Sequence, residues 1–306
     1  MLLNPQQQQK PTFILGMGAQ KAGTSWLHRE LSRCHQINLG FRKEYNAFPT
    51  RQSNLKKASR RLLRSQNSFD RVGFEDLPDS CKLDWMRKDS RYYLYYFENL
   101  LRANSELNAT GDLSPHYGEL TQHEMFRVRH LLEGGGFKVK VIFLLRDPVE
   151  RIWSQLRMLR NQNRFPELCG YRNEETALAM VYTNPRFSAK TQYHQTLESL
   201  EKCFQKSQIH VEFYEDLFTS AAHKRLCDFL ELDLPSPQFE VRVNSLQKQS
   251  ELCPMLQRKI AVAYREVYEA MITRFGSKTL KLWPNAQIIH ENPTPARKGW
   301  AKVLPW

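Results

Sequence analysis

Residues that could bind an anion are concentrated in residues 12–34, which read TFILGMGAQKAGTSWLHRELSRC. An apolar run of strand type is followed by glycines that permit a tight loop, Gly16, Gly18 and Gly23. Lys21 adds a positive charge within this loop, and Thr24 and Ser25 add hydroxyl groups where a helical pattern begins. A strand, a glycine loop and a helix together present backbone N–H groups to an anion. The segment predicts an anion-binding loop, and the simpler alternative is a tight strand-to-helix turn.

The position of the lysine separates this loop from a nucleotide-binding P-loop. A P-loop has the pattern GxxxxGK[ST], with the lysine directly after the last glycine. Here Gly18 and Gly23 keep the spacing, but Thr24 follows Gly23 and the lysine comes earlier, at Lys21. A P-loop kinase or NTPase remains the main alternative function, and it would also need a magnesium-binding aspartate at the end of a strand.

A second group of candidate ligand-binding residues follows the clearest strand, residues 138–145 (KVKVIFLL). Asp147 and Pro148 predict the N-cap and first position of a helix, so Asp147 fits a cap better than a magnesium ligand. Arg146 ends the strand and Ser154 lies two turns into the helix. The carboxyl edge of a parallel sheet is where such folds bind ligands, and arginine can hold a phosphate with two hydrogen bonds. The alternatives are a surface ion pair for Arg146 and a helix back-bond for Ser154.

The remaining elements predict one α/β domain with a mainly parallel central sheet flanked by helices. Short strands are expected at 37–40 and 209–213, residues 110–117 are expected to form a strand end and a loop, and residues 70–88 are interpreted as irregular. Helices are expected at 92–101, 173–183, 190–205, 216–230 and, as one long helix, 254–275. The predicted organisation is a disordered leader at 1–11, a domain at 12–283 and a C-terminal tail at 284–306 that is a candidate part of the cofactor or acceptor site.

Composition restricts the possible partners. The 306 residues include 45 Lys and Arg against 32 Asp and Glu, a formal net charge of +13, and 41% are hydrophobic. This balance suits an anionic cofactor, a polyanionic acceptor, nucleic acid or a membrane surface. A nucleic-acid-binding module would interleave basic residues with exposed aromatics, whereas the aromatics here lie in apolar segments. The basic residues of 51–66 are interpreted as the solvated face of a surface helix.

Cysteine and histidine spacing predicts neither disulfides nor a metal site. Six cysteines are scattered without a CxxC pair, which favours a reducing, cytoplasmic location. His116, His123 and His130 are seven residues apart, but no HExxH pattern accompanies them. No apolar run approaches the ~18–20 residues of a membrane span, and no secretory pattern opens the chain.

Both candidate binding segments resemble motifs of one enzyme family. GAQKAGTSWL resembles the 5′-phosphosulfate loop of sulfotransferases, which use 3′-phosphoadenosine 5′-phosphosulfate (PAPS). KVIFLLRDPVERIWSQ resembles their 3′-phosphate motif, with Arg146 and Ser154 at its arginine and serine positions. The resemblance spans about residues 12–283, is greatest to bacterial members, and implies a P-loop-like PAPS-binding fold. It implies these loop residues as cofactor contacts: Gly18, Ala19, Gln20, Lys21, Ala22, Gly23, Thr24, Ser25 and Trp26.

Looser similarities concern other parts of the site. FRKEYNAF resembles the segment that carries a catalytic glutamate in heparan-type members, although Asn46 stands where histidine is frequent. TGDLSPHY is similar to the family's GE-x-[ST]-P-x-Y loop, with Asp112 in place of glutamate, and VEFYEDLF resembles a late strand-to-helix segment. Arg297, Lys298 and Gly299 are similar to an RKG that helps hold the 3′-phosphate in cytosolic members. The usual following Gly-Asp-Trp is missing here, so a disordered basic tail is the alternative.

The reaction that the resemblance implies is in-line transfer of a sulfuryl group from PAPS to a hydroxyl, or less often an amine, without a metal. The acceptor would be a small molecule or a carbohydrate. Lys21 would stabilise the leaving phosphate, and Glu44 would be the general base. His116 is the main competitor for the base and Asp112 the third choice. The simpler interpretation of Glu44 is an ion pair with Lys43 or Arg42.

Overall fold

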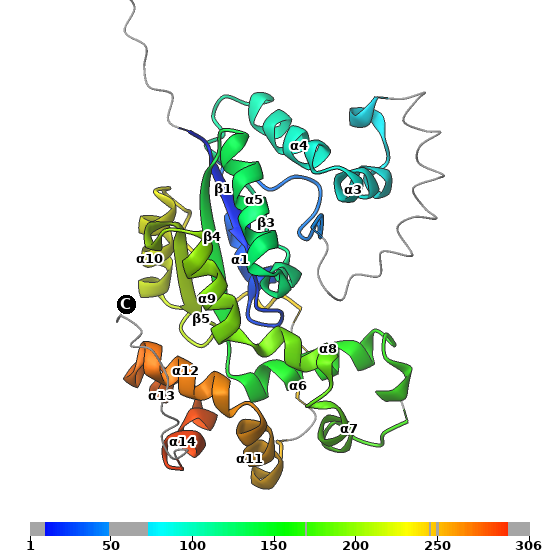
Figure 1. The fold of residues 1–306 in the computed structure, drawn as a ribbon, viewed down its shortest axis with the longest axis vertical. Helices are drawn as coiled ribbons and strands as arrows, with labels where there is room; N and C mark the ends of the chain where they lie inside the picture. The colour runs from blue at the N-terminus through cyan, green and yellow to red at the C-terminus, as the bar shows by residue number, and fades with distance from the viewer. Residues whose placement is uncertain (1–9, 49–72, 169, 245, 249–250, 293–306) are drawn as a thin grey trace, which may run out of the picture.

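The computed structural model describes residues 10–48, 73–168, 170–244, 246–248 and 251–292. Its centre is a parallel sheet with the strand order β2-β3-β1-β4-β5 (Figure 1). The strands are β1 (Thr12–Gly16), β2 (Ile37–Asn38), β3 (Ala109–Asp112), β4 (Lys138–Leu145) and β5 (Ile209–Phe213). β1 and β3 are buried throughout and β4 is buried from Val139 onward, as expected for apolar strands covered on both faces. The predicted α/β class and the parallel sheet are confirmed.

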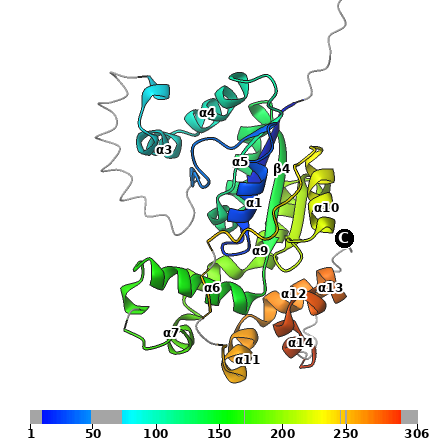
Figure 2. The same cartoon turned by 180° about the vertical axis from the view of Figure 1, so that it is seen from behind.

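Helices cover both faces of this sheet. The helices around the sheet are α1 (Thr24–Leu31), α4 (Ser90–Arg102), α5 (Gln122–Gly134), α9 (Tyr193–Cys203) and α10 (Ser220–Leu230), and α3 (Asp79–Lys88) packs mainly against α4. Helices α5 and α9 lie on the face toward the viewer in Figure 1, and α1 and α10 lie on the opposite face, seen in Figure 2.

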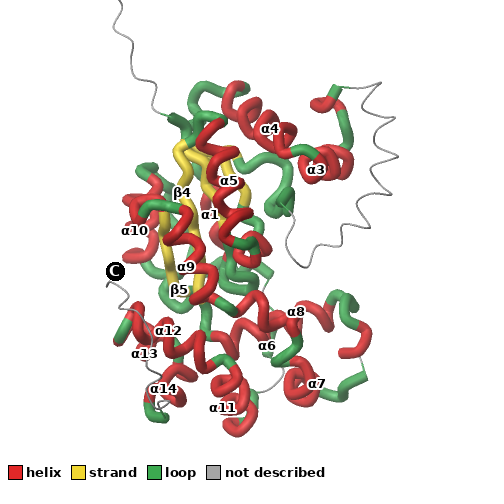
Figure 3. The backbone as a smooth tube through the Cα atoms, in the orientation of Figure 1, coloured by secondary structure: helices red, strands yellow, loops and turns green. Residues whose placement is uncertain are grey.

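A separate layer of helices lies beyond the carboxyl ends of the strands (Figure 3). It consists of α6 (Pro148–Asn161), α7 (Glu174–Val181), α8 (Pro185–Ser188), α11 (Pro254–Ala263), α12 (Arg265–Phe275), α13 (Ser277–Leu282) and α14 (Pro284–His290). Short 3₁₀ helices connect several elements, among them Pro115–Glu119 after β3 and Ala189–Thr191 before α9. This layer faces the sheet edge at which the candidate ligand-binding residues lie.

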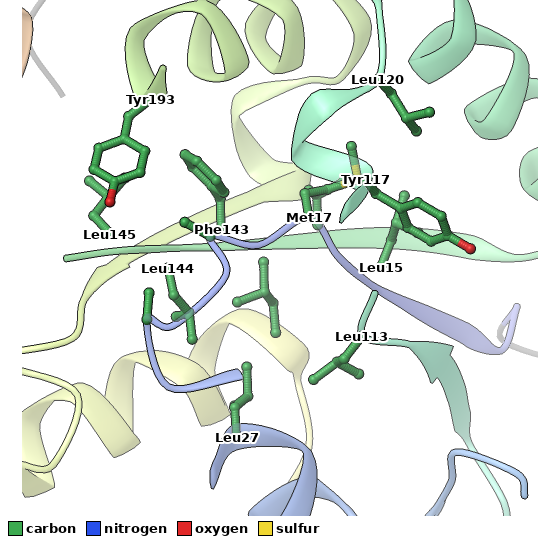
Figure 4. Close-up of a cluster of buried hydrophobic side chains, with 14 of the residues drawn as sticks. Leu15, Met17, Leu27, Leu113, Tyr117, Leu120, Phe143, Leu144, Leu145 and Tyr193 are labelled. Atoms are coloured by element: carbon green, nitrogen blue, oxygen red, sulfur yellow. The ribbon is translucent and has the colours of Figure 1, made fainter. Parts of the chain in front are cut away.

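The core supports that edge directly. Figure 4 shows Leu27 of α1 and Leu144 of β4 on either side of the chain that leaves β1, with Met17 nearby. All of these side chains are at most 1% exposed. Fully burying a leucine is worth roughly 1.5–3 kcal/mol, so the start of α1 is held against the sheet by its apolar face. The predicted inner residues Leu27, Leu31 and Cys34 are all buried.

Some predicted boundaries were wrong. The expected helix over residues 254–275 is two helices, because Tyr264 adopts φ −107° and ψ 21° between them. The Tyr264 ring is buried, and its hydroxyl donates to the Tyr182 carbonyl oxygen. Residues 70–88 are not irregular throughout, since α3 occupies Asp79–Lys88 and buries Leu83, Trp85 and Met86. Helix α10 begins at Ser220 rather than 216, where the Thr219 hydroxyl caps it by accepting from Ala222 N.

The residues predicted as a tail begin with an ordered helix. α14 buries Ala286 and Ile289 and packs against α11 and α12. The leader residues 1–9, the basic segment 51–66 and the candidate contacts Arg297, Lys298 and Gly299 lie outside the described residues.

Candidate active site

The glycine loop, residues 16–25, is held by the main chain of the sheet. Ala19 N donates to Leu144 O at 2.7 Å and Leu144 N donates to Gly18 O at 2.8 Å, which extends the pairing of β1 with β4. Gly23 has φ 93°, and a Cβ at this position would lie 2.7 Å from Leu217 Cδ2. Glycine avoids both the left-handed strain and this contact. The loop therefore has a fixed path that depends little on its own side chains.

Side chains at the start of α1 contact a segment that is distant in sequence. The Trp26 ring is buried, its Nε1 donates to Gln238 O at 3.2 Å, and it stacks near Phe239 at 6.1 Å between centroids. The Ser25 hydroxyl accepts from Asn244 Nδ2 at 3.3 Å. Residues 238–244 thus border the glycine loop, which the sequence analysis did not predict.

Lys21 is half-buried in a region that is crowded with positive charge. Its pKa is lowered to about 8, chiefly by burial and then by the charges of Arg146 and Arg157. The positive charges of Lys43 and Arg151 also lower the pKa of Lys21. An anionic ligand would relieve this repulsion, so the region suits a molecule with several negative charges.

Arg146 joins the end of β4 to the glycine loop. Its Nη1 donates to the Lys21 carbonyl oxygen at 2.9 Å, and its guanidinium carbon lies 4.4 Å from the centroid of the Tyr214 ring. Its own carbonyl oxygen accepts from the Tyr193 hydroxyl at 2.9 Å. The two predicted binding segments therefore meet, although they are 125 positions apart in the chain.

Asp147 has the structural role that its position before Pro148 predicted. It is 1% exposed, and its carboxylate caps α6 by accepting from Val149 N at 2.9 Å. The same carboxylate accepts from the Tyr268 hydroxyl at 2.8 Å and from Asn285 Nδ2 at 3.2 Å. These partners occupy the oxygens that a P-loop kinase would need for magnesium. They also fix the corner that carries Arg146.

Helix α6 brings a further arginine to the site. Ser154 is half-buried on this helix, and Arg157, three residues later, lies on the same side. The Arg157 guanidinium lies 4.9 Å from the Trp153 ring, and its Nε and Nη1 have no hydrogen-bond partner among the described residues. The sequence analysis missed Arg157, although its spacing from Ser154 could have revealed it.

The KE loop, residues 39–47, follows β2 and carries Glu44 to the start of α1. Lys43 Nζ lies 2.5 Å from Glu44 Oε1 and 3.3 Å from Thr24 Oγ1. The Glu44 side chain is 36% exposed, so solvent and small molecules can reach it. The ion pair with Lys43 that the sequence offered as the simpler interpretation is present, and it places the carboxylate beside the glycine loop.

His116 lies in the 3₁₀ helix after β3 and has an acidic neighbour. Its Nδ1 is 3.1 Å from Glu119 Oε1, and Lys190 Nζ is 4.0 Å from the same oxygen. The His116 side chain is 34% exposed, whereas that of Glu119 is 6% exposed. A carboxylate at Nδ1 orients the ring and directs Nε2 away from it. Neither Glu119 nor Lys190 was singled out from the sequence.

Asp112 differs from the other two base candidates because it has no exposed surface. Burial raises its pKa to about 6. The hydroxyls of Ser114 and Tyr117 donate to its carboxylate at 2.5 Å and 2.6 Å, and that of Tyr93 donates at 3.2 Å. A fully buried carboxylate with these partners is placed to organise its surroundings rather than to contact an acceptor.

The described residues show no sign of two other kinds of site. In the part of the chain that the structure describes, no His, Cys, Asp and Glu side chains are grouped as a metal site would require. Among the described helices, none is both long and apolar enough to cross a membrane.

Comparison with known proteins identifies the family. The model of the sulfotransferase family matches residues 11–236. A sulfotransferase from Alicyclobacillus acidocaldarius has a similar structure, with a TM-score of 0.54 and 19% identity over 85% of this chain and 94% of that one. The sulfotransferase domain of the Synechococcus PCC 7002 olefin synthase gives a TM-score of 0.43 at 17% identity, over 78% and 82% of the two chains. Comparison with curated protein sequences gives no match. The family match covers most of the chain, and the protein therefore belongs to the sulfotransferase family.

Proposed function

We propose that this protein transfers the sulfuryl group of PAPS to the hydroxyl, or less readily the amine, of a small-molecule or carbohydrate acceptor. The observation that carries the proposal is the convergence of three segments at one sheet edge. Arg146 Nη1 binds the Lys21 carbonyl oxygen at 2.9 Å, and Lys43 links Glu44 to Thr24 of the glycine loop. Groups that could hold an anionic donor and a group that could take a proton are thus adjacent.

The described residues fit a donor that carries phosphate and sulfate groups. Burial and, after it, the positive charges of Arg146 and Arg157 lower the pKa of Lys21 to about 8. Arg146 Nε and two nitrogens of Arg157 are buried without a hydrogen-bond partner among the described residues. Buried donors of this kind are costly unless a ligand or water satisfies them. An anion that accepts from these arginines would offset both the repulsion and the missing hydrogen bonds.

We assign the donor contacts according to the two motifs. The backbone of residues 18–25 and Lys21 would hold the 5′-phosphosulfate, beside Trp26. Arg146 and Ser154 would hold the 3′-phosphate, where the guanidinium can donate two hydrogen bonds and the hydroxyl a third. A contribution from Arg297, Lys298 and Gly299 stays a prediction, because these residues are outside the described part of the chain.

The protein's own groups then have separate tasks in the reaction. PAPS, when bound, supplies the sulfuryl group and a leaving phosphate that gains negative charge. Lys21 is preorganised to stabilise this charge, since the glycine loop fixes its backbone. Glu44 accepts the proton of the acceptor hydroxyl; Lys43 is bound to Oε1, so we assign the proton to Oε2.

His116 is the alternative base. Its contact with Glu119 is of the kind that orients a catalytic imidazole, and its Nε2 would take the proton. We favour Glu44 because its ion-pair partner Lys43 contacts Thr24 of the glycine loop. The contacts of His116 are instead with Glu119 and, through it, Lys190, neither of which belongs to the glycine loop.

A comparison of three ligands tests the class of reaction. We expect 3′-phosphoadenosine 5′-phosphate (PAP) to raise the melting temperature in EDTA, because the proposed contacts need no metal. Stabilisation by ATP that requires magnesium, without an effect of PAP, would instead indicate a P-loop kinase. Stabilisation by an oligonucleotide alone would indicate nucleic-acid binding.

Labelled PAPS tests the acceptor class once PAP binding is established. Alcohols, phenols, sugars, glycans and amines are offered in parallel, and label should move to a hydroxyl-bearing compound.

We place this reaction in the cytoplasm, a proposal that the free cysteines Cys34, Cys81, Cys203, Cys227 and Cys253 support.

A further inference from the structure

The backbone of the KE loop is bound in an unusual way just after Glu44. Successive N–H groups of residues 45–47 each donate to a side chain of the Asp112 segment, residues 112–117. The bonds are Tyr45 N to Asp112 Oδ1 at 3.3 Å, Asn46 N to Ser114 Oγ at 3.0 Å and Ala47 N to Tyr117 Oη at 2.9 Å. One short segment, which begins at the last residue of β3, therefore binds the chain beside the proposed base.

The acceptors in the Asp112 segment are themselves held in place. Asp112, Ser114 and Tyr117 are each 0% exposed, and both hydroxyls donate to the Asp112 carboxylate. Each hydroxyl thus donates to Asp112 and accepts from the KE loop. Leaving a buried N–H without its acceptor costs about 1–3 kcal/mol, so the loss of one of these acceptors should loosen the KE loop.

The carbonyl groups of the same residues are bound from the other direction. Arg87 of α3 donates from Nη2 to Tyr45 O at 3.2 Å and from Nε to Asn46 O at 3.1 Å. Asn46 has φ 48°, a left-handed conformation that is uncommon for a residue other than glycine. The hydrogen bonds on both sides of Asn46 account for its holding this conformation.

We propose that Asp112, Ser114 and Tyr117 are positioning residues for Glu44. They bind the peptide groups that follow Glu44 and so fix the origin of its side chain relative to the glycine loop. This inference rests on the proposed role of Glu44 as base. It gives Asp112 a function in the reaction that does not require contact with the acceptor.

The first experiment measures the loop without relying on catalysis. Ser114→Ala and Tyr117→Phe each remove an acceptor for the KE loop. Tyr93→Phe is the matched control, because it also removes a buried hydroxyl that donates to Asp112, and the described bonds of Tyr93 do not reach the loop backbone. We expect amide hydrogen exchange at residues 45–47 to be about tenfold faster in the first two variants and within about threefold of wild type in the control. Unchanged exchange in Ser114→Ala would overturn the proposal.

The second experiment tests whether the effect passes through Glu44. Turnover is measured as PAP release from PAPS, with a mixture of simple alcohols, phenols and monosaccharides as acceptors. We expect Ser114→Ala to lower kcat about tenfold, since small displacements of a catalytic group are costly, while the Kd of PAP changes less than about twofold. In a Glu44→Gln background the same change should cost less than about twofold, because no base remains to be positioned.

The outcomes separate this inference from the proposed function. If Ser114→Ala lowers kcat equally in both backgrounds, its role is structural only and the inference is overturned. The same holds if Ser114→Ala and Tyr93→Phe both lower kcat in proportion to the decrease that each causes in the melting temperature. Full turnover of Glu44→Gln would contradict the base assignment and the positioning role together. Loss of PAP binding in the wild-type protein would contradict the proposed function itself.

Discussion

The glycine loop and the KE loop lie next to each other, but different interactions hold them. The glycine loop continues a sheet ladder, with main-chain bonds between Gly18, Ala19 and Leu144. The KE loop has main-chain groups bound by side chains, those of Asp112, Ser114, Tyr117 and Arg87. Changing a side chain of the glycine loop itself should therefore leave its main-chain bonds in place, whereas the KE loop loses main-chain bonds when one of these four side chains is removed.

This difference predicts which substitutions weaken donor binding and which lower turnover. Changes of side chains in the glycine loop should remove a charge or a contact and leave the geometry intact. Changes in the residues that hold the KE loop should alter turnover and leave donor binding nearly normal. Three substitutions and a change of pH can contradict or refine this comparison.

Glu44→Gln should have the largest effect. Removing a general base typically costs about 10²–10⁴-fold in rate, so kcat should fall by that factor while the Kd of PAP stays within about twofold of wild type. Steady-state turnover and calorimetry with PAP measure the two quantities. His116→Ala is the comparison variant: if it abolishes turnover while Glu44→Gln keeps most of it, the base is His116.

Lys21→Ala should lower turnover more than donor affinity. Its interaction strengthens as the leaving phosphate gains charge, and a preorganised donor of this kind is worth about 10²–10³-fold in kcat. Saturating PAPS separates kcat from affinity. A variant with weak binding but normal kcat at saturation would make Lys21 a binding residue only.

Arg146→Ala should weaken PAP binding about ten- to a hundredfold, as expected for a charged hydrogen bond worth roughly 1.5–3 kcal/mol. Adenosine 5′-phosphosulfate, which lacks the 3′-phosphate, should be affected far less. Arg160→Ala, on helix α6, is the control, because the Arg160 guanidinium donates to Tyr171 O. Equal weakening of both ligands would place Arg146 away from the 3′-phosphate.

The pH dependence of PAP binding should show the smallest effect. The pKa of Lys21 is lowered to about 8, so its ammonium group loses its proton as the pH rises through about 8. A bound anion favours the charged form, and affinity should therefore fall above this pH, by at most about tenfold per pH unit. Calorimetric titrations with PAP between pH 7 and 9.5 measure this decrease in affinity.

Lys21→Arg provides the control for this pH effect, because arginine keeps its charge throughout the range. The decrease in affinity should then disappear. A decrease that persists unchanged in Lys21→Arg would belong to another group, and the cluster around Lys21 would need a different titrating residue.

Most of the predicted fold was confirmed because it depends on local patterns. The apolar run of β4, Asp147 as N-cap and Pro148 at the first helical position gave the β4–α6 corner correctly. The apolar spacing continues through Tyr264 and therefore predicts a single helix over residues 254–275. The break depends on where the buried Tyr264 side chain packs, and local periodicity contains no such information.

For the candidate site, too, the sequence indicates individual residues but not the contacts between them. Sequence motifs indicated Lys21, Arg146 and Glu44, but they gave no sign that Lys43 contacts Thr24 or that Arg157 lies near Lys21. The residue type and motif of Asp112 make it a candidate base. The structure shows that its carboxylate is fully buried beneath hydroxyl groups.

Local sequence patterns predict the glycine loop and the β4–α6 corner, because glycines, caps and apolar spacing act between near neighbours in the chain. How these segments meet depends on the tertiary fold. The bonds between the KE loop and the Asp112 segment join residues 67 to 70 positions apart, and the contact of Arg146 with Lys21 joins residues 125 apart. Such bonds form only after the parallel sheet has brought the carboxyl ends of its strands to one edge, so no local pattern contains them.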